Sequence, residues 1–296
     1  MQNKTVVIVG VLDEQQSTNV WQAAAFMRNG WNVIPINYRN FKDGFAEHYK
    51  FIVERFNPEL VLLSKVNGVD PNIFSSVKAR NVWYWFMDNI KVAEAVNAIE
   101  YAKISSHASA TSSEVVELFK TVNQSSYNII EGFEPKIFYK EEAEKDIDIL
   151  FFGNATAKRI ELLSKIDKKV EVFGVGWPEE FKANNLVFLD DLRKVIARSK
   201  IVLNLVHSNI FSDRVVTAMA CGSFVLSEYC RDLFTYFDNE EHLVWFTNTD
   251  ECNKYINEYL VDNNKREQIA QNGMKKVNEL YTWDMVIQRI IHLIGE

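Results

Sequence analysis

An arginine at the start of a predicted helix is the residue of this sequence best placed to bind an anion. The apolar run 201–206 is followed by hydroxyl, amide and imidazole side chains, and Arg214 then falls in the first turn of the next predicted helix. Because the helix dipole disfavours a cation at this end, an arginine there is better explained by an anion bound at the same point. Pairing with a neighbouring carboxylate, or simple solvation, is the alternative. The other candidate ligand-binding residues of this segment are His207, Asn209, Ser212 and Asp213.

A second arginine, Arg159, follows another apolar run, in the sequence ILFFGNATAKR. Gly153 would let the backbone approach a ligand, and Thr156 can cap a helix that points at a phosphate. Asn154 lies in the same turn. The alternative is a plain strand-to-helix turn that carries a surface arginine.

Two glycines, Gly174 and Gly176, follow a third apolar run and are also candidate points of ligand approach. They lack the third glycine of G-x-G-x-x-G and the acidic residue expected after it, so NAD binding is a poor interpretation. The chain also lacks G-x-x-x-x-G-K-[ST], which excludes the P-loop nucleotide hydrolases. Asp190 and Asp191 are adjacent, which is more typical of a helix N-terminus than of a metal site, and no metal or other cofactor is expected.

In the first half of the chain, Asp88 and His107 are the candidate catalytic groups. Asp88 follows the apolar run VWYWFM and could orient or deprotonate a hydroxyl group, or else cap a helix over 89–98. His107 follows a strand predicted at 103–105, in the polar stretch SSHASATSS, where an ordinary loop histidine is an equal alternative.

Composition restricts the class of protein. The 296 residues carry 33 basic and 40 acidic side chains, a net charge of -7, which disfavours a protein that coats nucleic acid or anionic lipid but allows a local basic pocket. Three cysteines without a C-x-x-C pair indicate reduced thiols, as expected in the cytoplasm. No apolar run reaches the roughly 18 residues of a membrane span, so we predict neither a signal peptide nor a transmembrane helix.

Short β-branched runs alternate with helical periods along the whole chain, which is typical of parallel sheets wrapped by helices. The predicted strands are 5–9, 32–36, 60–63, 82–86, 103–105, 128–130, 147–152, 170–173, 186–189, 201–206, 224–227 and 243–246. A helix is predicted over 112–122, with Thr111 and Glu114 as a capping box. The pattern stops in the charged stretch EGFEPKIFYKEEAEK. We therefore predict an α/β fold with two Rossmann-like, doubly wound lobes facing across a cleft: an N-terminal domain at 1–135, a second domain at 146–275, and a helix at 276–296 packed across the lobe junction.

The stretch 147–290 resembles the donor domain of the retaining nucleotide-sugar glycosyltransferases with the GT-B fold, and in particular their group 1 and spore maturation protein branch. The matching elements are DIDILFFGN with Arg159, VEVFGVGW, LDDLRKVIARSKIVLNLVHSN, SDRVVTAMACGSFVLSE and REQIAQNGMKKVNELYTW. The first lobe resembles the acceptor domain of that family more loosely, through NPELVLL, WYWFMD and EGFEPKIFY.

The resemblance implies roles for several residues. Backbone amides and Arg159 or Arg214 would hold a diphosphate, and the nucleoside base would lie near the loop 188–191, which includes Leu189. Many members carry two glutamates, one on the sugar and one on the ribose; here Asn209 and Thr217 stand at those positions, and neither can make a charge-assisted hydrogen bond.

The function that this resemblance implies is transfer of a sugar from a nucleotide donor, such as a UDP- or GDP-sugar, to a hydroxyl acceptor, with retention and without a metal. A catalytically inactive nucleotide-binding or regulatory protein of the same fold is the alternative. The acceptor stays open between a glycan precursor, a protein, a small metabolite and, as in some compact relatives, a hydroxymethylated base of phage DNA; the net charge disfavours DNA, although a basic strip on one face would be compatible with it.

Overall fold

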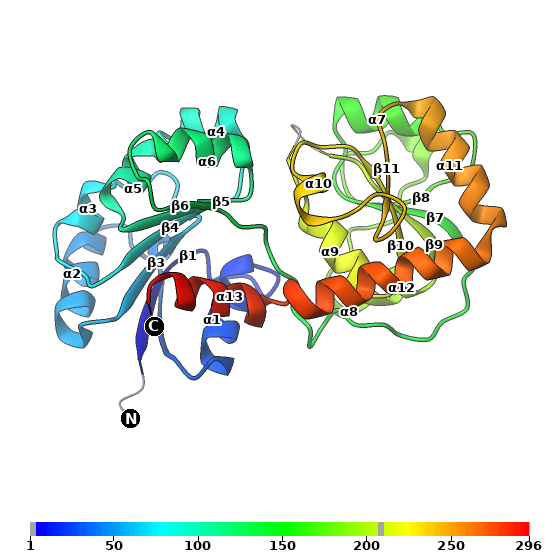
Figure 1. Cartoon of the computed structure of the whole chain (residues 1–296). Helices are drawn as coiled ribbons and strands as arrows, with labels where there is room; N and C mark the ends of the chain where they lie inside the picture. The colour runs from blue at the N-terminus through cyan, green and yellow to red at the C-terminus, as the bar shows by residue number, and fades with distance from the viewer. Residues whose placement is uncertain (1–3, 207–209, 296) are drawn as a thin grey trace. The chain divides into compact units, whose positions relative to one another are not determined.

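The computed structural model describes residues 4–206 and 210–295 and divides the chain into two compact units (Figure 1). The first unit comprises the chain up to Glu131 together with the C-terminal segment from Trp283, and the second comprises Gly132–Thr282. The predicted α/β class with two parallel, doubly wound sheets is confirmed.

The first unit is built on a parallel sheet with the strand order β2-β1-β3-β4-β5-β6. Its strands are β1 (Thr5–Gly10), β2 (Asn32–Asn37), β3 (Leu60–Ser64), β4 (Val82–Phe86), β5 (His107–Ala110) and β6 (Ser126–Asn128). Its helices are α1 (Thr18–Arg28), the 3-10 turn η1 (Tyr38–Asn40), α2 (Phe45–Phe56), α3 (Asn72–Ser75), α4 (Ile90–Ala95), α5 (Ala98–Ile104), α6 (Ser113–Lys120) and α13 (Trp283–Leu293). The strand order reverses between β1 and β3, and such a reversal marks the usual ligand-binding crevice of this architecture.

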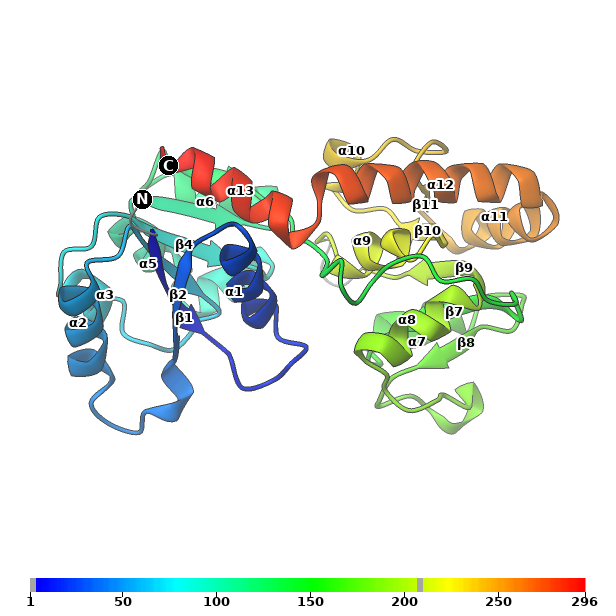
Figure 2. The same ribbon diagram turned by 90° about the horizontal axis from the view of Figure 1, so that it is seen from below.

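Both faces of this sheet are buried, which explains why its strands read as nearly continuous apolar runs. Along β1, Val7 and Val9 face a core shared with α2 to α6, whereas Val6 and Ile8 face a core shared with α1 and α13. Figure 2 shows α1 and α13 side by side on that second face. Arg28 of α1 fixes their contact, with its Nε 2.7 Å from the carboxylate of Asp284.

The second unit is built on a parallel sheet with the strand order β11-β10-β9-β7-β8. Its strands are β7 (Ile147–Phe152), β8 (Glu171–Phe173), β9 (Ser199–Asn204), β10 (Phe224–Glu228) and β11 (Val244–Phe246). Its helices are α7 (Ala157–Leu163), the 3-10 turn η2 (Glu179–Phe181), α8 (Leu189–Ala197), α9 (Asp213–Ala220), α10 (Leu233–Tyr236), α11 (Thr249–Val261) and α12 (Asn263–Leu280). The strand order reverses between β7 and β9.

Two predicted strands of the first half are misplaced. Residues 103–105 close helix α5, and the strand is the next segment, β5. Its small residues Ala108 and Ala110 lie fully buried beside the large aromatic side chains of β4, so packing against β4 outweighs the low strand propensity of alanine. The strand predicted at 128–130 ends at Asn128.

The second half holds two further differences. The run 186–189 is not a strand, because Leu186 and Phe188 are solvent-exposed and Leu189 begins α8. The strand predicted at 201–206 begins and ends two residues earlier, at Ser199 and Asn204.

The helix predicted over 112–122 runs from Ser113 to Lys120, and its N-cap is Ser112. The predicted capping box with Thr111 is therefore wrong, and the Thr111 hydroxyl is buried without a partner in the described part of the chain. Near the C-terminus, the segment predicted as one helix at 276–296 is divided between two helices, because α12 ends at Leu280 and α13 begins at Trp283. The second of these helices, α13, belongs to the compact first unit.

Candidate functional site

The candidate anion site lies at the carboxyl edge of the second sheet, where β7 and β9 are neighbours. Gly153 follows β7, and Leu205 follows β9. The chain leaves β7 toward β8 on one side, while β9 pairs on the other side, so the two exit loops diverge at this point. Divergence of the exit loops leaves a crevice in open parallel sheets.

Arg159 folds back over the exit of β7. Helix α7 begins at the N-cap Thr156, whose hydroxyl accepts a hydrogen bond from the Arg159 backbone N–H at 3.2 Å. The guanidinium donates to the carbonyl of Asn154 at 2.8 Å and to that of Leu205 at 3.3 Å. Only 7% of this residue is exposed, and its Nε is buried without a partner among the described residues.

Arg214 approaches the same carbonyl from α9. Ser212 is the N-cap of α9, and its hydroxyl accepts from the Arg214 backbone N–H at 3.4 Å. The side chain donates from Nε to the Asn204 Oδ1 at 3.2 Å and from Nη2 to the Leu205 carbonyl at 3.3 Å. Asn204 is itself fixed, since its Nδ2 donates to the Ser227 hydroxyl at 2.9 Å.

The two guanidinium groups therefore concentrate positive charge at one point. Both lie over the ring of Phe151, at 5.5 Å for Arg159 and 6.0 Å for Arg214. Within residues 4–206 and 210–295, neither makes an ion pair with a carboxylate. Burial, and next the charge of Arg159, lowers the pKa of Arg214 to about 10, so both arginines are charged at neutral pH. Two adjacent cations, of which Arg159 is buried and Arg214 is half-buried, form a site for an anion because neither has a carboxylate ion-pair partner among the described residues.

Glycine at position 153 leaves the space that these arginines occupy. A Cβ there would lie 3.2 Å from the Arg214 Nη1 and 3.5 Å from the Arg159 Nη1. The backbone φ of 146° also disfavours any residue with a side chain.

The predicted candidates Gly174 and Gly176 lie in the loop after β8. A Cβ on Gly174 would stand 2.1 Å from the Gly153 carbonyl oxygen, so this glycine permits close packing of the two exit loops. Trp177 completes the contact by donating from its indole N–H to the same carbonyl at 3.0 Å. Gly176 has a φ of 80°, which glycine adopts without strain.

A carboxylate that sequence reasoning missed, Glu228, borders the arginine pair. It ends β10, and only 15% of its side chain is exposed. It accepts a hydrogen bond from the Val206 backbone N–H at 3.1 Å and pairs with the Lys158 ammonium at 2.6 Å. Its position at a strand exit was the available signal, but its partners are far away in the sequence.

Two apolar side chains between β8 and α8 are exposed to solvent. Val175, which follows β8, is 53% exposed, and Phe188, the N-cap of α8, is 45% exposed. Leu189 begins this helix with a left-handed φ of 51°. The carbonyl of Val175 accepts from the Ala155 N–H at 3.0 Å, which joins its loop to the exit of β7.

The remaining candidates of this unit are distributed as follows. Asp213 is the exposed first residue of α9, and Thr217 is a buried residue one turn later. His207 and Asn209 lie outside the described residues.

In the first unit, Asp88 lines a hollow of about 580 Å³ at the carboxyl edge of its sheet. The hollow also takes in the exit loops of β1 and β3, the strand pair at which the order reverses. Asp88 is exposed and does not cap the next helix, because Asn89 is the N-cap of α4 and accepts from the Val92 N–H at 3.1 Å.

His107 lies elsewhere. It begins β5, at the amino edge of the first sheet, so it does not follow a strand as predicted. Its ring stacks on Trp83 at 5.2 Å and lies 6.3 Å from Tyr127, and burial lowers its pKa. The structure therefore gives His107 a packing role and removes the reason for the catalytic prediction.

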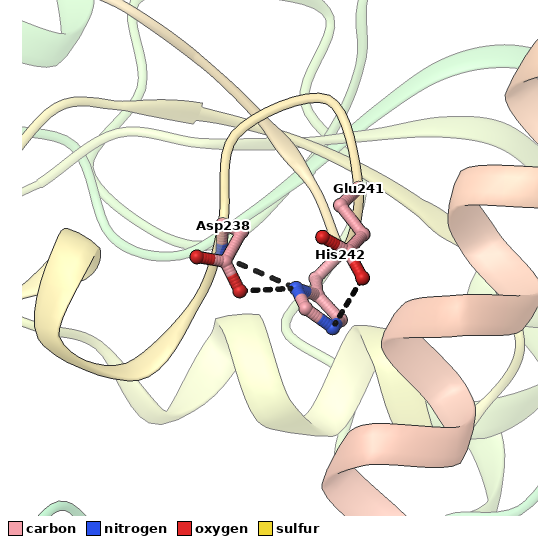
Figure 3. Close-up of side chains that lie close together, drawn as sticks. All are labelled: Asp238, Glu241 and His242. Atoms are coloured by element: carbon pink, nitrogen blue, oxygen red, sulfur yellow. Dashed lines mark hydrogen bonds and ion pairs between the residues drawn. The ribbon is translucent and has the colours of Figure 1, made fainter.

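Three side chains of types that often bind metal ions lie close together in the loop before β11 (Figure 3). Ligand atoms of Asp238, Glu241 and His242 lie within 4.8 Å of one another. However, His242 Nδ1 accepts from the Asp238 backbone N–H at 3.2 Å, and the Lys276 ammonium stands 3.5 Å from the Asp238 carboxylate. A metal ion would have to displace the Asp238 backbone N–H from His242 and the Lys276 ammonium from Asp238. These residues are therefore better explained as stabilising the conformation of the loop.

Known proteins share the fold of this chain. Residues 155–292 match the family model described as glycosyl transferase-like. No curated protein matches the sequence. Among solved structures, HepE of Anabaena in complex with UDP and glucose is similar with a TM-score of 0.75 and 12% identity, over 99% of this chain and 100% of that one. Sucrose-phosphate synthase of Thermosynechococcus elongatus has a TM-score of 0.75 and 13% identity, over 98% of each chain. A DNA-modifying β-glucosyltransferase has a TM-score of 0.66 and 13% identity, over 99% of this chain and all of that one.

Fold and family model together define the class that this chain resembles: it has the GT-B fold, and residues 155–292, somewhat less than half of the chain, match the glycosyl transferase-like family. This match agrees with the resemblance of the segment 147–290 to the group 1 enzymes. Among the described residues, no helix is long and apolar enough to cross a membrane.

Proposed function

We propose that the second unit binds a nucleotide-sugar donor and that the protein transfers its sugar to a hydroxyl group of an acceptor. The observation that carries this proposal is the pair Arg159 and Arg214, two guanidinium groups on one carbonyl with no carboxylate partner among the described residues. A diphosphate supplies the missing negative charge. HepE, with which this chain shares its fold, was solved with UDP and with UDP-glucose.

The proposed role of the arginines follows from the negative charge that develops on the leaving group during sugar transfer. Transfer breaks the bond between the anomeric carbon and the diphosphate oxygen, and the departing oxygen gains negative charge. Preorganised cations aimed at that oxygen lower the barrier. Arg214 is preorganised because Asn204 and Leu205 fix its guanidinium before any ligand binds. Since two arginines neutralise the leaving group, the proposed reaction needs no metal, and retention is proposed from the resemblance to the group 1 enzymes.

The rest of the donor has candidate contacts on the same edge of the sheet. The exposed apolar side chains of Val175 and Phe188 offer a surface for a nucleoside base. Gly153 leaves the β7 exit without a side chain beside the arginines. In the first unit, Asp88 is the proposed group that orients the acceptor hydroxyl or takes its proton.

One observation favours a second function, nucleotide binding without turnover. Thr217 stands where many members of the resembled family carry a ribose-binding glutamate, and it lies buried in α9. A threonine hydroxyl makes a weaker hydrogen bond to a ribose than a carboxylate does.

Release of nucleotide from UDP-, GDP-, CMP- and dTDP-sugars, measured with the whole chain, separates the two functions. Turnover above background that is lost in Arg214→Ala and kept in Arg198→Ala supports the transferase. Arg198 is a matched control, since it pairs with Asp146 on the surface of the same unit. Binding of a nucleotide without turnover of any donor supports the second function.

A further inference from the structure

The size of the hollow in the first unit, and the polar and charged side chains that line it, favour one class of acceptor. About 580 Å³ lies within the range of roughly 300–1,000 Å³ typical of small-molecule sites. The side chains that define its chemistry are Glu14, Arg39, Lys65, Asn67, Asp88 and Glu131.

Part of this wall is held in place by a chain of hydrogen bonds. The Lys65 ammonium donates to the Thr18 hydroxyl at 3.2 Å, and that hydroxyl donates to the Glu131 carboxylate at 3.0 Å. The backbone of Lys65 is also fixed, because its carbonyl accepts from the Tyr38 hydroxyl at 3.1 Å. The ammonium and the Glu131 carboxylate are thus positioned before a ligand arrives.

Two other side chains in the hollow have hydrogen-bonding capacity to spare. The Asp88 carboxylate and the Asn67 side-chain amide make no hydrogen bond or ion pair with any residue of the described chain. A carboxylate accepts and an amide both donates and accepts, which matches the hydroxyl groups of a polyol.

The charged side chains of the hollow disfavour DNA and lipid as occupants. Three carboxylates, those of Glu14, Asp88 and Glu131, face two cations, and one of these, Arg39, already lies 3.8 Å from Asp13. A surplus of carboxylates repels a polyanion such as DNA. A wall with this many charged groups also offers little apolar surface to a lipid chain.

We infer that this hollow binds a neutral, polyhydroxylated acceptor, a mono- or disaccharide, and that Asp88 accepts a hydrogen bond from one of its hydroxyl groups. This inference rests on the proposed transferase function and names the acceptor class for it. DNA and lipid acceptors are outcomes that would contradict it.

The first measurement is binding, which does not depend on turnover. Sucrose, maltose, lactose and cellobiose are titrated into the whole protein and followed by saturation-transfer NMR. At least one should bind, and Asp88→Asn should weaken that binding about tenfold or more, as expected when a charge-assisted hydrogen bond is lost. Asp43→Asn, which alters an exposed carboxylate outside the hollow, should leave it unchanged.

The second measurement is transfer, with the same sugars, a duplex oligonucleotide containing hydroxymethylcytosine, and a detergent-dispersed lipid alcohol as acceptors. Transfer to a sugar that falls in Asp88→Asn supports the inference. Transfer to the oligonucleotide or the lipid alone, absence of sugar binding at about 50 mM, or equal binding by Asp88→Asn overturns it. UDP binding by the same sample is measured in parallel, so failure of the donor proposal is seen separately.

Discussion

Replacing Arg214 by methionine tests how the anion site works. Methionine keeps the length and apolar stem of arginine but removes the guanidinium that Asn204 and Leu205 hold. A hydrogen bond to a charged group contributes about 1.5–3 kcal/mol, so UDP affinity should fall roughly 10- to 150-fold. Because loss of one preorganised donor costs about 10²–10³ in rate, turnover of a UDP-sugar should fall by about 10²-fold or more.

The same substitution should not destabilise the ligand-free protein. Burial and the neighbouring charge of Arg159 lower the pKa of Arg214 to about 10, which means that the fold holds this charge at a cost. The melting temperature of Arg214→Met without ligand should therefore equal or exceed that of the wild type, while the rise in melting temperature on adding UDP is lost. This combination is expected where a site keeps charge for its ligand.

The assay is a thermal melt with and without UDP, together with calorimetric titration of UDP. Arg198→Ala, which removes an exposed arginine of the same unit, should keep both the affinity and the thermal shift. If Arg214→Met binds UDP as the wild type does, the arginine pair does not hold the diphosphate and the reasoning is wrong.

Three further perturbations test other parts of the account. Glu228→Gln removes a negative charge beside the arginine pair and should tighten UDP binding roughly two- to fivefold in calorimetry; weaker binding would mean that this carboxylate contacts the ligand. Gly174→Ala places a Cβ 2.1 Å from the Gly153 carbonyl and should cost about 1–3 kcal/mol or more in chemical denaturation, clearly more than Gly30→Ala, where a Cβ meets nothing within 4 Å. Burial lowers the pKa of His107, so its neutral form favours the fold and stability should fall as the pH drops below about 6.5. His107→Phe should reduce that slope in melts from pH 8 to pH 5, and an unchanged slope would assign it to another group.

The fold could be predicted where strands are buried on both faces. The strand predicted at 147–152 has the bounds of β7, and that predicted at 82–86 has the bounds of β4. Such strands read as continuous apolar runs bounded by polar residues. The prediction failed at β5, where small residues fit beside the large side chains of β4, a constraint that no local pattern contains.

In the candidate site, the residues that follow a strand could be predicted from the sequence, but their long-range partners could not. Ser212 and Asp213 are both residue types that cap helices, and either one as the cap places Arg214 in the first turn of α9. The shared carbonyl of Leu205 and the carboxylate of Glu228 could not be predicted, because they meet the arginines only through the pairing of β9 with β7 and β10. The strand next to His107 was misplaced, so its position at the amino edge of the sheet was not predicted.

A crystal structure of the whole protein grown with UDP tests the central claim most directly. The account predicts that the diphosphate lies within hydrogen-bonding distance of the guanidinium groups of both Arg159 and Arg214, beside the bare backbone of Gly153. A UDP molecule bound elsewhere, with both arginines still engaged only on the Leu205 carbonyl, would contradict it.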